Sequence, residues 1–420
     1  MKVLVVGGGG REHAIVRALS RSARAPQVLC APGNPGIAAD ARTFPVRADD
    51  VPGLVALARE EGVQLVVVGP EVALIAGVVD ALAQAGIAAF GPVAAAARLE
   101  GSKAFAKEVM AAAGVPTAAW TRVSDVEAGL QAVPSYPVAI KFDGLAAGKG
   151  VVIAADEAQA RAALEAFLVE RRHGPGDVVV EEFLEGEELS LFALCDGERA
   201  LPMAPAQDYK RIFDGDAGPN TGGMGSYSPV GGIDATRASE IAGLVHQPVV
   251  DELARRGTPF HGVLYAGLML TAGGVRVIEF NARFGDPETQ AVLPRLRSDL
   301  LELAQAAVTP GGLAGARLDW DPRWAVTLVL AAAGYPEAPR TGDEIHGLER
   351  VGAGIEVTHA GTAHADGRLV TAGGRVLNVT ALGDTPAAAR EAAYAAADLI
   401  DFEGRQLRRD IALRAVERTA

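Results

Sequence analysis

The stretch YPVAIKFDGLAAGKGVVIA, residues 136–154, decides how the rest of the chain is interpreted. Two apolar, β-branched runs, 138–142 and 151–153, flank a loop rich in glycine, and this pattern predicts a strand, a loop and a second strand. Glycine has no Cβ atom, so peptide N–H groups can close around phosphate oxygens, while Lys141 and Lys149 add positive charge. The stretch favours a clamp for nucleotide phosphates. The alternative is a hairpin whose glycines serve only the turn.

The spacing of the loop glycines disfavours a Walker NTPase. A Walker loop has four residues between its first glycine and its Gly-Lys pair, a Ser or Thr after the lysine, and then a helix. Here three residues separate Gly144 from Gly148, and Gly150 stands where the hydroxyl residue belongs. A strand rather than a helix is expected next, so we expect a different class of phosphate clamp.

Composition narrows the functional classes. The chain has 420 residues, enough for roughly three domains at about 150 residues each. Its net charge of −13 argues against general binding of nucleic acid, which basic surfaces hold. No apolar run approaches the ~20 residues of a membrane span, and no signal peptide is evident, so we expect a cytoplasmic protein with no membrane partner. Cys30 and Cys195 lie in apolar runs and are predicted to be buried thiols.

Residues 1–90 alternate short apolar runs with helical patterns, which predicts a parallel sheet wrapped by helices. Ligands of such sheets bind at the carboxyl ends of the strands. Glycine and polar residues follow the predicted strands, and we expect six of them to bind a substrate: Gly9, Arg11, Glu12, Gly33, Asn34 and Glu71.

A nicotinamide cofactor is disfavoured at this sheet. The third glycine of the dinucleotide fingerprint would fall on Glu12 or His13, and no acidic residue ends the second predicted strand. A phosphate at the N-terminus of the first helix, with Arg11 beside it, remains compatible with the sequence.

Residues 115–190 read as a small lid built from two hairpins and helices. Lys103, near the start of a preceding helical pattern, could reach a nucleotide or could be a plain surface lysine. The apolar run 178–180 ends in Glu181 and Glu182, where a strand edge could bind adenine and Glu188 could bind ribose hydroxyls. The alternative for this acidic run is a solvated turn.

The segment 202–229 is rich in glycine and proline and has no apolar period, which predicts a long functional loop. Its polar residues Lys210, Arg211, Asn220 and Thr221 are candidates for contact with phosphates or substrate.

A predicted strand at 275–280 delivers Glu279 and Asn281 to one face, because alternate residues of a strand share a side. A carboxylate and an amide oxygen suit a hard cation such as Mg²⁺. Arg283, Asp286 and Glu288 follow in a tight loop, where an arginine could hold a carboxylate or a phosphoryl group. As an alternative, Glu279 could be an edge-strand residue paired with Arg283.

Taken together, the ordered motifs resemble the glycinamide ribonucleotide synthetase family (phosphoribosylamine–glycine ligases) of the ATP-grasp superfamily, over essentially the whole chain. The motifs are GGREH at 9–13, APGN at 31–34, VGPE at 68–71, FGP at 90–92, LEGSKAF at 99–105, DGLAAGKGV at 143–151, EEFLEGEE at 181–188, GPNTGGMG at 218–225, LYAGLM at 264–269, EFNARFGDPETQ at 279–290 and HAGT at 359–362.

The resemblance implies a multidomain α/β and α+β architecture. It comprises a Rossmann-like substrate domain at 1–100, an ATP-grasp domain at 101–324 with its lid at about 115–190, and a small α+β domain at 325–420. It also implies an ATP site with these members: Lys103, Lys141, Gly144, Gly148, Lys149, Gly150, Glu181, Glu182, Leu184 and Glu188. Glu279 and Asn281 would hold Mg²⁺, or Mn²⁺, with phosphates and water completing a sparse ligand set.

For catalysis the resemblance points to Arg283, Lys210 and Asn220, and Asp286 joins the substrate residues. The implied reaction activates glycine with ATP and joins it to 5-phosphoribosylamine. Two rivals are another ATP-grasp ligase or carboxylase, which would differ in the N-terminal loops, and a dinucleotide-dependent oxidoreductase, which would bind NAD(P) tightly. The sequence leaves the oligomeric state open, with a monomer slightly favoured.

Overall fold

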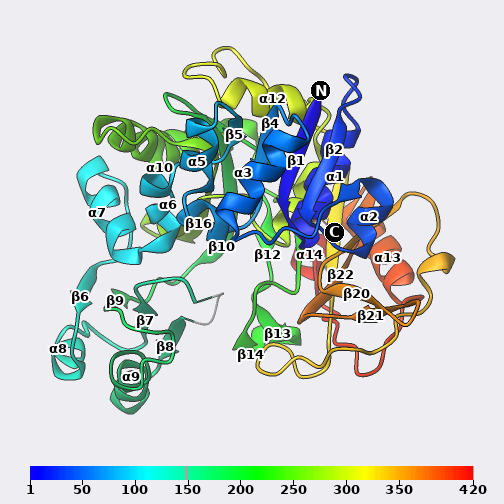
Figure 1. The fold of residues 1–420 in the computed structure, drawn as a ribbon. Helices are drawn as coiled ribbons and strands as arrows, with labels where there is room; N and C mark the ends of the chain where they lie inside the picture. The colour runs from blue at the N-terminus through cyan, green and yellow to red at the C-terminus, as the bar shows by residue number, and fades with distance from the viewer. Residues whose placement is uncertain (147–149, 420) are drawn as a thin grey trace.

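The structure, a computed structural model, describes residues 1–146 and 150–419 (Figure 1). Gly148 and Lys149, both predicted to bind ATP, lie outside the described residues. The N-terminal sheet, the lid and the C-terminal sheet lie around a central sheet. In Figure 1 the lid projects at the lower left and the C-terminal strands lie at the lower right.

The N-terminal sheet has five parallel strands in the order β3-β2-β1-β4-β5, which confirms the predicted parallel architecture. The strands are β1 (Lys2–Gly7), β2 (Gln27–Pro32), β3 (Arg42–Thr43), β4 (Leu65–Val68) and β5 (Ala88–Phe90). The helices around them are α1 (Gly10–Ser20), α2 (Pro35–Asp40), α3 (Val51–Glu60), α4 (Glu71–Ile75), α5 (Val78–Gln84) and α6 (Ala94–Gly101). Strands β1 and β4 are apolar and buried on both faces, as expected of a covered parallel sheet.

The lid is one antiparallel sheet in the order β6-β9-β7-β8, not two separate hairpins. Its strands are β6 (Trp120–Val123), β7 (Val138–Phe142), β8 (Val151–Ala154) and β9 (Val178–Glu182), covered by α8 (Val126–Gln131) and α9 (Glu157–Leu164). Strands β7 and β8 pair directly, which confirms the predicted strand, loop and strand. The lid also has its own hydrophobic cluster, in which Ile140, Phe142, Leu164 and Phe167 are buried. It is therefore packed as a unit.

The central sheet runs β11-β10-β16-β17. Its strands are β10 (Glu187–Asp196), β11 (Ala200–Pro202), β16 (His261–Thr271) and β17 (Gly274–Asn281), and the neighbouring helices are α7 (Lys103–Ala113), α10 (Ala235–Arg255), α11 (Glu288–Val292) and α12 (Leu300–Ala307). Ser102 caps α7 by accepting a hydrogen bond from the Phe105 N–H group, so one long helical pattern in the sequence becomes two helices, α6 and α7.

The C-terminal sheet has five strands in the order β12-β15-β18-β22-β19. Its strands are β12 (Gln207–Asp208), β15 (Gly225–Ser228), β18 (Trp324–Ala331), β19 (Ile355–His359) and β22 (Arg375–Gly383). Nearby lie the hairpins β13 (Arg211–Phe213) with β14 (Ala217–Asn220) and β20 (Thr362–Ala365) with β21 (Arg368–Thr371), and the helices α13 (Pro386–Ala397) and α14 (Leu413–Thr419).

The prediction that 202–229 forms a loop without strands is wrong, because this segment contributes β12 and β15 to the C-terminal sheet. All four residues of β15, with the sequence GSYS, are buried. Glycine is needed at the first of these positions, since a Cβ atom on Gly225 would lie 2.7 Å from the Thr327 carbonyl oxygen. The other residues of β15 besides Tyr227 are glycine and serine, which carry no alternating apolar signal, so sequence patterning could not reveal this strand.

Two further expectations concern the cysteines and membrane-spanning segments. Cys30 and Cys195 are free and buried, which confirms their prediction as core thiols. Among the helices of the described ranges, none is both long and apolar enough to span a membrane.

Candidate active site

A buried group of charges joins the lid to the central sheet. Glu181 at the end of β9 accepts hydrogen bonds through Oε2 from Lys107 Nζ at 2.8 Å and Lys141 Nζ at 2.9 Å. Burial would raise the pKa of Glu181, but the two lysines outweigh burial and lower it. Burial also lowers the pKa of Lys107 to about 8, although Glu181 opposes that change. Glu181 thus acts here as a counter-ion for two lysines, and its contact with ATP stays a prediction.

The start of α7 is tied to the glycine-rich loop. Asp143 Oδ1 accepts hydrogen bonds from Ser102 Oγ at 2.9 Å and from the Ala104 N–H group at 3.1 Å. Lys103 Nζ donates to the Gly144 carbonyl oxygen at 3.1 Å. Burial lowers the pKa of Lys103, and the charge of Glu279 partly offsets this effect. These contacts favour a site role for Lys103 over that of a plain surface lysine.

Strand β17 ends in the two predicted metal ligands. Burial would raise the pKa of Glu279, but the positive charges of Lys210, Lys141, Lys103 and Arg283 outweigh it and lower the pKa. Glu279 is therefore a carboxylate surrounded by cations.

Arg283 makes its ion pairs elsewhere. Its Nε lies 3.1 Å from Glu71 Oε2 and its Nη2 lies 2.5 Å from Glu100 Oε1, while Asn281 Oδ1 accepts a longer bond from Nη2 at 3.3 Å. These contacts disfavour the alternative in which Glu279 is only the structural partner of Arg283.

The donor set at the end of β17 fits a hard cation. Glu279 offers a carboxylate and Asn281 an amide oxygen, the oxygen donors that Mg²⁺ takes. Within residues 1–146 and 150–419, no group of three or more histidine, cysteine, aspartate or glutamate residues is placed to hold a metal.

The segment after β12 faces the same region. Lys210 Nζ lies 2.8 Å from Glu188 Oε2 on β10, and Glu188 raises the pKa of Lys210 even though burial opposes this. Thr221 donates to the Lys210 carbonyl oxygen through its N–H group at 2.7 Å and its hydroxyl at 2.8 Å. Asn220 pairs with Arg211 across the β13–β14 hairpin. The structure thus brings together the four polar residues that the sequence singled out in this segment.

The strand edge that is predicted to bind adenine already uses one of its hydrogen-bond donors within the protein. The Glu182 N–H group donates to the Ala119 carbonyl oxygen at 2.9 Å, so this donor is used inside the lid. Leu184 lies between β9 and β10, outside both strands. Contact of either residue with adenine stays a prediction.

A second site is a pocket of about 420 Å³ between the N-terminal and C-terminal parts of the chain. Asn34 bridges the two parts, because its Nδ2 donates to the Gly8 carbonyl oxygen at 2.9 Å and to the His359 carbonyl oxygen at 2.8 Å. The pocket contains four residues predicted to bind substrate, namely Gly9, Gly33, Asn34 and Asp286. Its full lining is Gly8, Gly9, Gly33, Asn34, Asp286, Ala360, Gly361, Thr362, Ala372 and Arg375.

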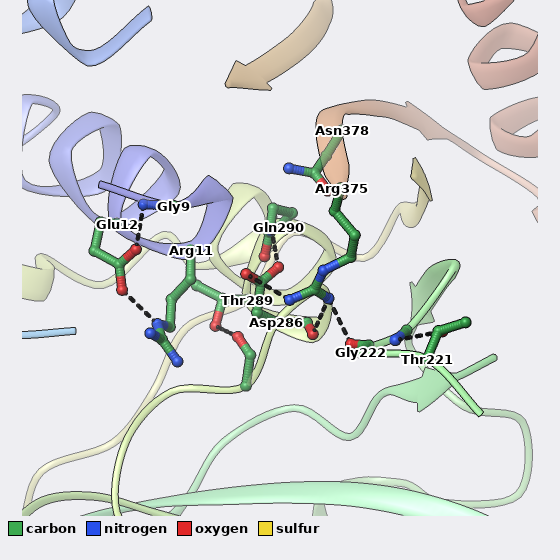
Figure 2. A network of polar contacts seen from close by, with 12 residues as sticks. Gly9, Arg11, Glu12, Thr221, Gly222, Asp286, Thr289, Gln290, Arg375 and Asn378 are labelled. Atoms are coloured by element: carbon green, nitrogen blue, oxygen red, sulfur yellow. Dashed lines mark hydrogen bonds and ion pairs between the residues drawn. The ribbon is translucent and has the colours of Figure 1, made fainter. Parts of the chain in front are cut away.

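Arg11 and Glu12 do not line this pocket, although the sequence placed a phosphate beside Arg11. Both side chains are buried. Arg11 Nε donates to Glu12 Oε1 at 2.6 Å, and Glu12 Oε2 accepts from the Gly9 N–H group at 2.7 Å (Figure 2). A carboxylate of the chain itself therefore caps the start of α1, where an external phosphate was expected. Contact of Arg11 with substrate stays a prediction that this geometry disfavours.

Glu71 and Glu100 lie on either side of Arg283 and differ in their titration. Burial would raise the pKa of Glu71, but Arg283 and Arg11 hold it at about 2. Burial raises the pKa of Glu100 to about 7 despite Arg283. Glu71 is predicted from its motif to bind substrate. It contacts Arg283 and does not line the pocket.

Sequence reasoning missed three charged residues of these sites: Glu100, Lys107 and Arg375. Lys107 had a usable signal, because it lies one helical turn after Lys103 on the same face of α7. Arg375 had none, since its contact with Asp286 joins residues 89 positions apart.

Comparison with known proteins finds three family models along the chain. The sequence profile of the phosphoribosylglycinamide synthetase N domain matches residues 1–100, that of its ATP-grasp (A) domain matches 101–289, and that of its C domain matches 325–414.

Full-length relatives agree. A phosphoribosylamine–glycine ligase from Streptomyces coelicolor is 54% identical, over 99% of this chain and 99% of the relative. One from Xanthomonas axonopodis pv. citri is 50% identical, over 100% of this chain and 99% of the relative. The crystal structure of phosphoribosylamine–glycine ligase from Thermotoga maritima is 34% identical, with a TM-score of 0.84 over 98% of this chain and 100% of that chain. The chain therefore belongs to the phosphoribosylglycinamide synthetase family.

Proposed function

We propose that this chain is an ATP-dependent ligase that joins glycine to 5-phosphoribosylamine. ATP phosphorylates the carboxylate of glycine and leaves as ADP. The amine of phosphoribosylamine attacks the carbonyl carbon of the glycyl phosphate, the C–O bond to phosphate breaks, and the amide and inorganic phosphate form. The step belongs to purine biosynthesis, as the ligase names of the relatives imply.

One observation carries this proposal. The segment from Glu279 to Asp286 runs from the lysine-lined end of β17 to the pocket between the N-terminal and C-terminal loops. Along the way Arg283 is fixed by Glu71 and Glu100. Two sites joined by one short segment suit a reaction in which an activated acid made at one site meets an amine held at the other.

The nucleotide site provides charge neutralisation. Lys103, Lys141, Lys149, Lys210 and Arg283 would face the phosphates, which become more anionic as phosphoryl transfer proceeds. Glu279 and Asn281 would hold Mg²⁺, or Mn²⁺, and the ion would supply further neutralisation of the ATP phosphates when bound. Asn220 lies beside Lys210 in the same segment and would help to orient the carboxylate.

The lid would exclude water. Glycyl phosphate hydrolyses easily, so closure of residues 115–190 over the nucleotide protects it from solvent. The backbone of Gly144, Gly148 and Gly150 would contact the phosphates, with Glu182 and Leu184 at adenine and Glu188 at the ribose. No covalent bond to the enzyme is required.

We further propose that the enzyme works in the cytoplasm, on small-molecule substrates. Its domains would be 1–100, 101–324 and 325–420. The C-terminal sheet includes strands from both sides of the boundary at residue 324, because β12 and β15 precede it in the chain.

A coupled assay of ADP release tests the proposed function. Rapid release should require ATP, glycine and freshly made phosphoribosylamine together, and mass spectrometry should detect the amide. Release that depends on another carboxylic acid or on bicarbonate, but not on glycine, would favour a different ATP-grasp ligase or carboxylase. Tight NAD(P) binding without ADP release would favour an oxidoreductase.

A further inference from the structure

Lys107, on α7, is a charged residue to which the proposed function gives no role. Its side chain is only 2% exposed. A lysine is almost never fully buried unless its ammonium group has partners. The partners of Lys107 therefore show what its charge does inside this part of the protein.

The ammonium group of Lys107 lies where the chain enters and leaves the lid. Its Nζ donates to Thr117 Oγ1 at 2.7 Å and to Glu181 Oε2 at 2.8 Å. Thr117 precedes β6, the first lid strand along the chain, and Glu181 lies near the end of β9, the last one. Thr117 Oγ1 in turn donates to the Val277 carbonyl oxygen of β17 at 2.7 Å. Lys107 thus contacts both chain crossings between the lid and the rest of the molecule.

Lys107 shares its carboxylate partner with Lys141. Lys141 Nζ donates to the same atom, Glu181 Oε2, at 2.9 Å, and to the Ile278 carbonyl oxygen of β17 at 3.2 Å. Burial lowers the pKa of Lys107 to about 8, against the opposing charge of Glu181, so the ammonium form still predominates at pH 7. Two positive charges therefore face one carboxylate, and the group as a whole has positive charge in excess.

This excess charge lies next to the expected phosphate site. Burial would raise the pKa of Glu279, but Lys210 and Lys141 are among the cations that lower it instead. The charge of Lys141 therefore acts at the end of β17. If Glu181 had Lys141 as its only partner, the two charges would largely cancel, and the phosphates would meet a nearly neutral pair.

We propose that Lys107 is a positioning residue of the nucleotide site, which shares Glu181 Oε2 with Lys141 and thereby leaves Lys141 with positive charge for the ATP phosphates. The inference rests on the ATP site of the proposed function and adds a residue that acts through Lys141, without contact with the nucleotide. The alternative is a purely structural lysine that neutralises Glu181 inside the protein.

Calorimetric titration of the full-length chain at pH 7, with ADP and with adenosine, separates the two roles. Lys107→Met removes the charge and keeps an unbranched side chain. It should weaken ADP binding by roughly tenfold, because Lys141 then pairs with Glu181 alone, and it should leave adenosine binding nearly unchanged. Lys2→Met, which breaks the Lys2–Glu61 pair of the N-terminal domain, is the matched control and should bind ADP like the wild type.

A double variant distinguishes charge from packing. Lys107→Met combined with Glu181→Gln removes one charge of each sign, so Lys141 again carries positive charge in excess. Most of the lost ADP affinity should therefore return, whereas a packing role predicts that the double variant binds ADP no better than Lys107→Met. Thermal unfolding shows whether each variant is folded. If Lys107→Met does not fold, Lys107→Gln, whose amide can still donate to Glu181, replaces it with the same expected outcome.

Three results overturn the proposal: wild-type ADP affinity in Lys107→Met, an equal loss for ADP and adenosine, or no recovery in the double variant. A wild-type chain that binds ADP no better than adenosine also overturns it. If the variants behave as expected but the wild-type chain shows no glycine-dependent ADP release, the proposed function fails and the role of Lys107 stands.

Discussion

Individual charged residues in this protein take their roles from the partners that the fold places beside them. Glu71 and Glu100 contact the same guanidinium of Arg283, yet the pKa of Glu71 is about 2 and that of Glu100 about 7. Burial acts on both carboxyl groups. At Glu71 the charges of Arg283 and Arg11 outweigh it, whereas at Glu100 burial prevails and the charge of Glu71 adds to it. Residue type alone does not determine the protonation state.

The first prediction concerns Glu279. If Glu279 carries the metal, Glu279→Gln should lower turnover by on the order of a hundredfold, because the phosphoryl charge loses the anchor of its counter-ion. The fold should persist, since the substitution removes the charge of Glu279 and hardly changes its volume. Steady-state ADP release at saturating Mg²⁺ measures the effect, and Glu349→Gln, at an exposed glutamate, is the control. Near-normal turnover of Glu279→Gln would remove the metal assignment.

The second prediction concerns buried His13 and half-buried His359, between the N-terminal and C-terminal parts. The His359 N–H group donates to His13 Nδ1 at 2.9 Å, and His13 Nε2 lies 2.8 Å from Asp40 Oδ2, which Arg17 also contacts. Burial lowers the pKa of His13, and burial together with His13 and Arg17 lowers that of His359 to about 4, although Asp40 opposes this and His364 adds to it.

For His359 the unfolded chain binds more protons than the folded chain between about pH 6.5 and about pH 4. The contribution of His359 to the free energy of unfolding is therefore fully present above about pH 6.5. It is lost on acidification through this window, by up to about 1.4 kcal/mol per pH unit. Urea unfolding measured at several pH values should show that the free energy of unfolding depends less steeply on pH in His359→Gln than in the wild-type chain. Equal slopes would mean that another group titrates.

At the scale of single elements, the glycine-rich loop is tied to the start of α7. Asp143 accepts hydrogen bonds from Ser102 and Ala104, and Lys103 reaches the Gly144 carbonyl oxygen. These contacts tie the first residues of the loop to α7, outside the lid sheet. The lid packs around its own hydrophobic cluster, which allows it to shift as a unit.

The third prediction follows from this arrangement. Addition of ATP and Mg²⁺ should slow hydrogen exchange at the amides of Gly144–Ala146 and Gly150, because a phosphate clamp closes on its ligand. Lys149→Ala should weaken ATP binding and abolish that gain together, since the cation helps to draw the loop onto the phosphates. Arg161→Ala, in an exposed lid pair with Glu127, is the control and should keep both. Equal protection with and without nucleotide would mean that the clamp is preformed.

At the scale of the whole molecule, the C-terminal sheet joins distant parts of the chain. Strand β15 pairs with β18, and β12 pairs with β15, so two strands of this sheet come from the segment that also carries Lys210 and Asn220. The nucleotide site and the pocket therefore share a structural support, and the C-terminal part cannot be a freely attached module.

The fourth prediction tests this dependence. A chain that ends at residue 324 loses β18, β19 and β22, which leaves β15 with an exposed edge and its buried face uncovered. Such a chain should aggregate or bind hydrophobic dyes and should lose cooperative thermal unfolding. A chain that ends at residue 412 lacks α14 but keeps all five strands, so it should stay folded and bind ATP. Cooperative unfolding and ATP binding by the shorter chain would contradict the prediction.

The sequence by itself determined the parallel N-terminal sheet, the strand, loop and strand of the lid, and the shared face of Glu279 and Asn281. It also determined the family resemblance, which the comparisons confirm. These features depend on residues close together in the chain, where the period of apolar residues and the position of glycines are sufficient.

Only the tertiary structure decided the partners of the charged residues and the membership of the C-terminal sheet. Arg375 meets Asp286 across 89 positions, Arg11 donates to Glu12 and to the Phe284 carbonyl oxygen, and β15 is buried although Gly225, Ser226 and Ser228 are small. Long-range contacts form because burial of the whole chain brings these groups together and requires each buried charge or backbone group to find a partner. That requirement is a property of the packed molecule, and no local stretch of sequence carries it.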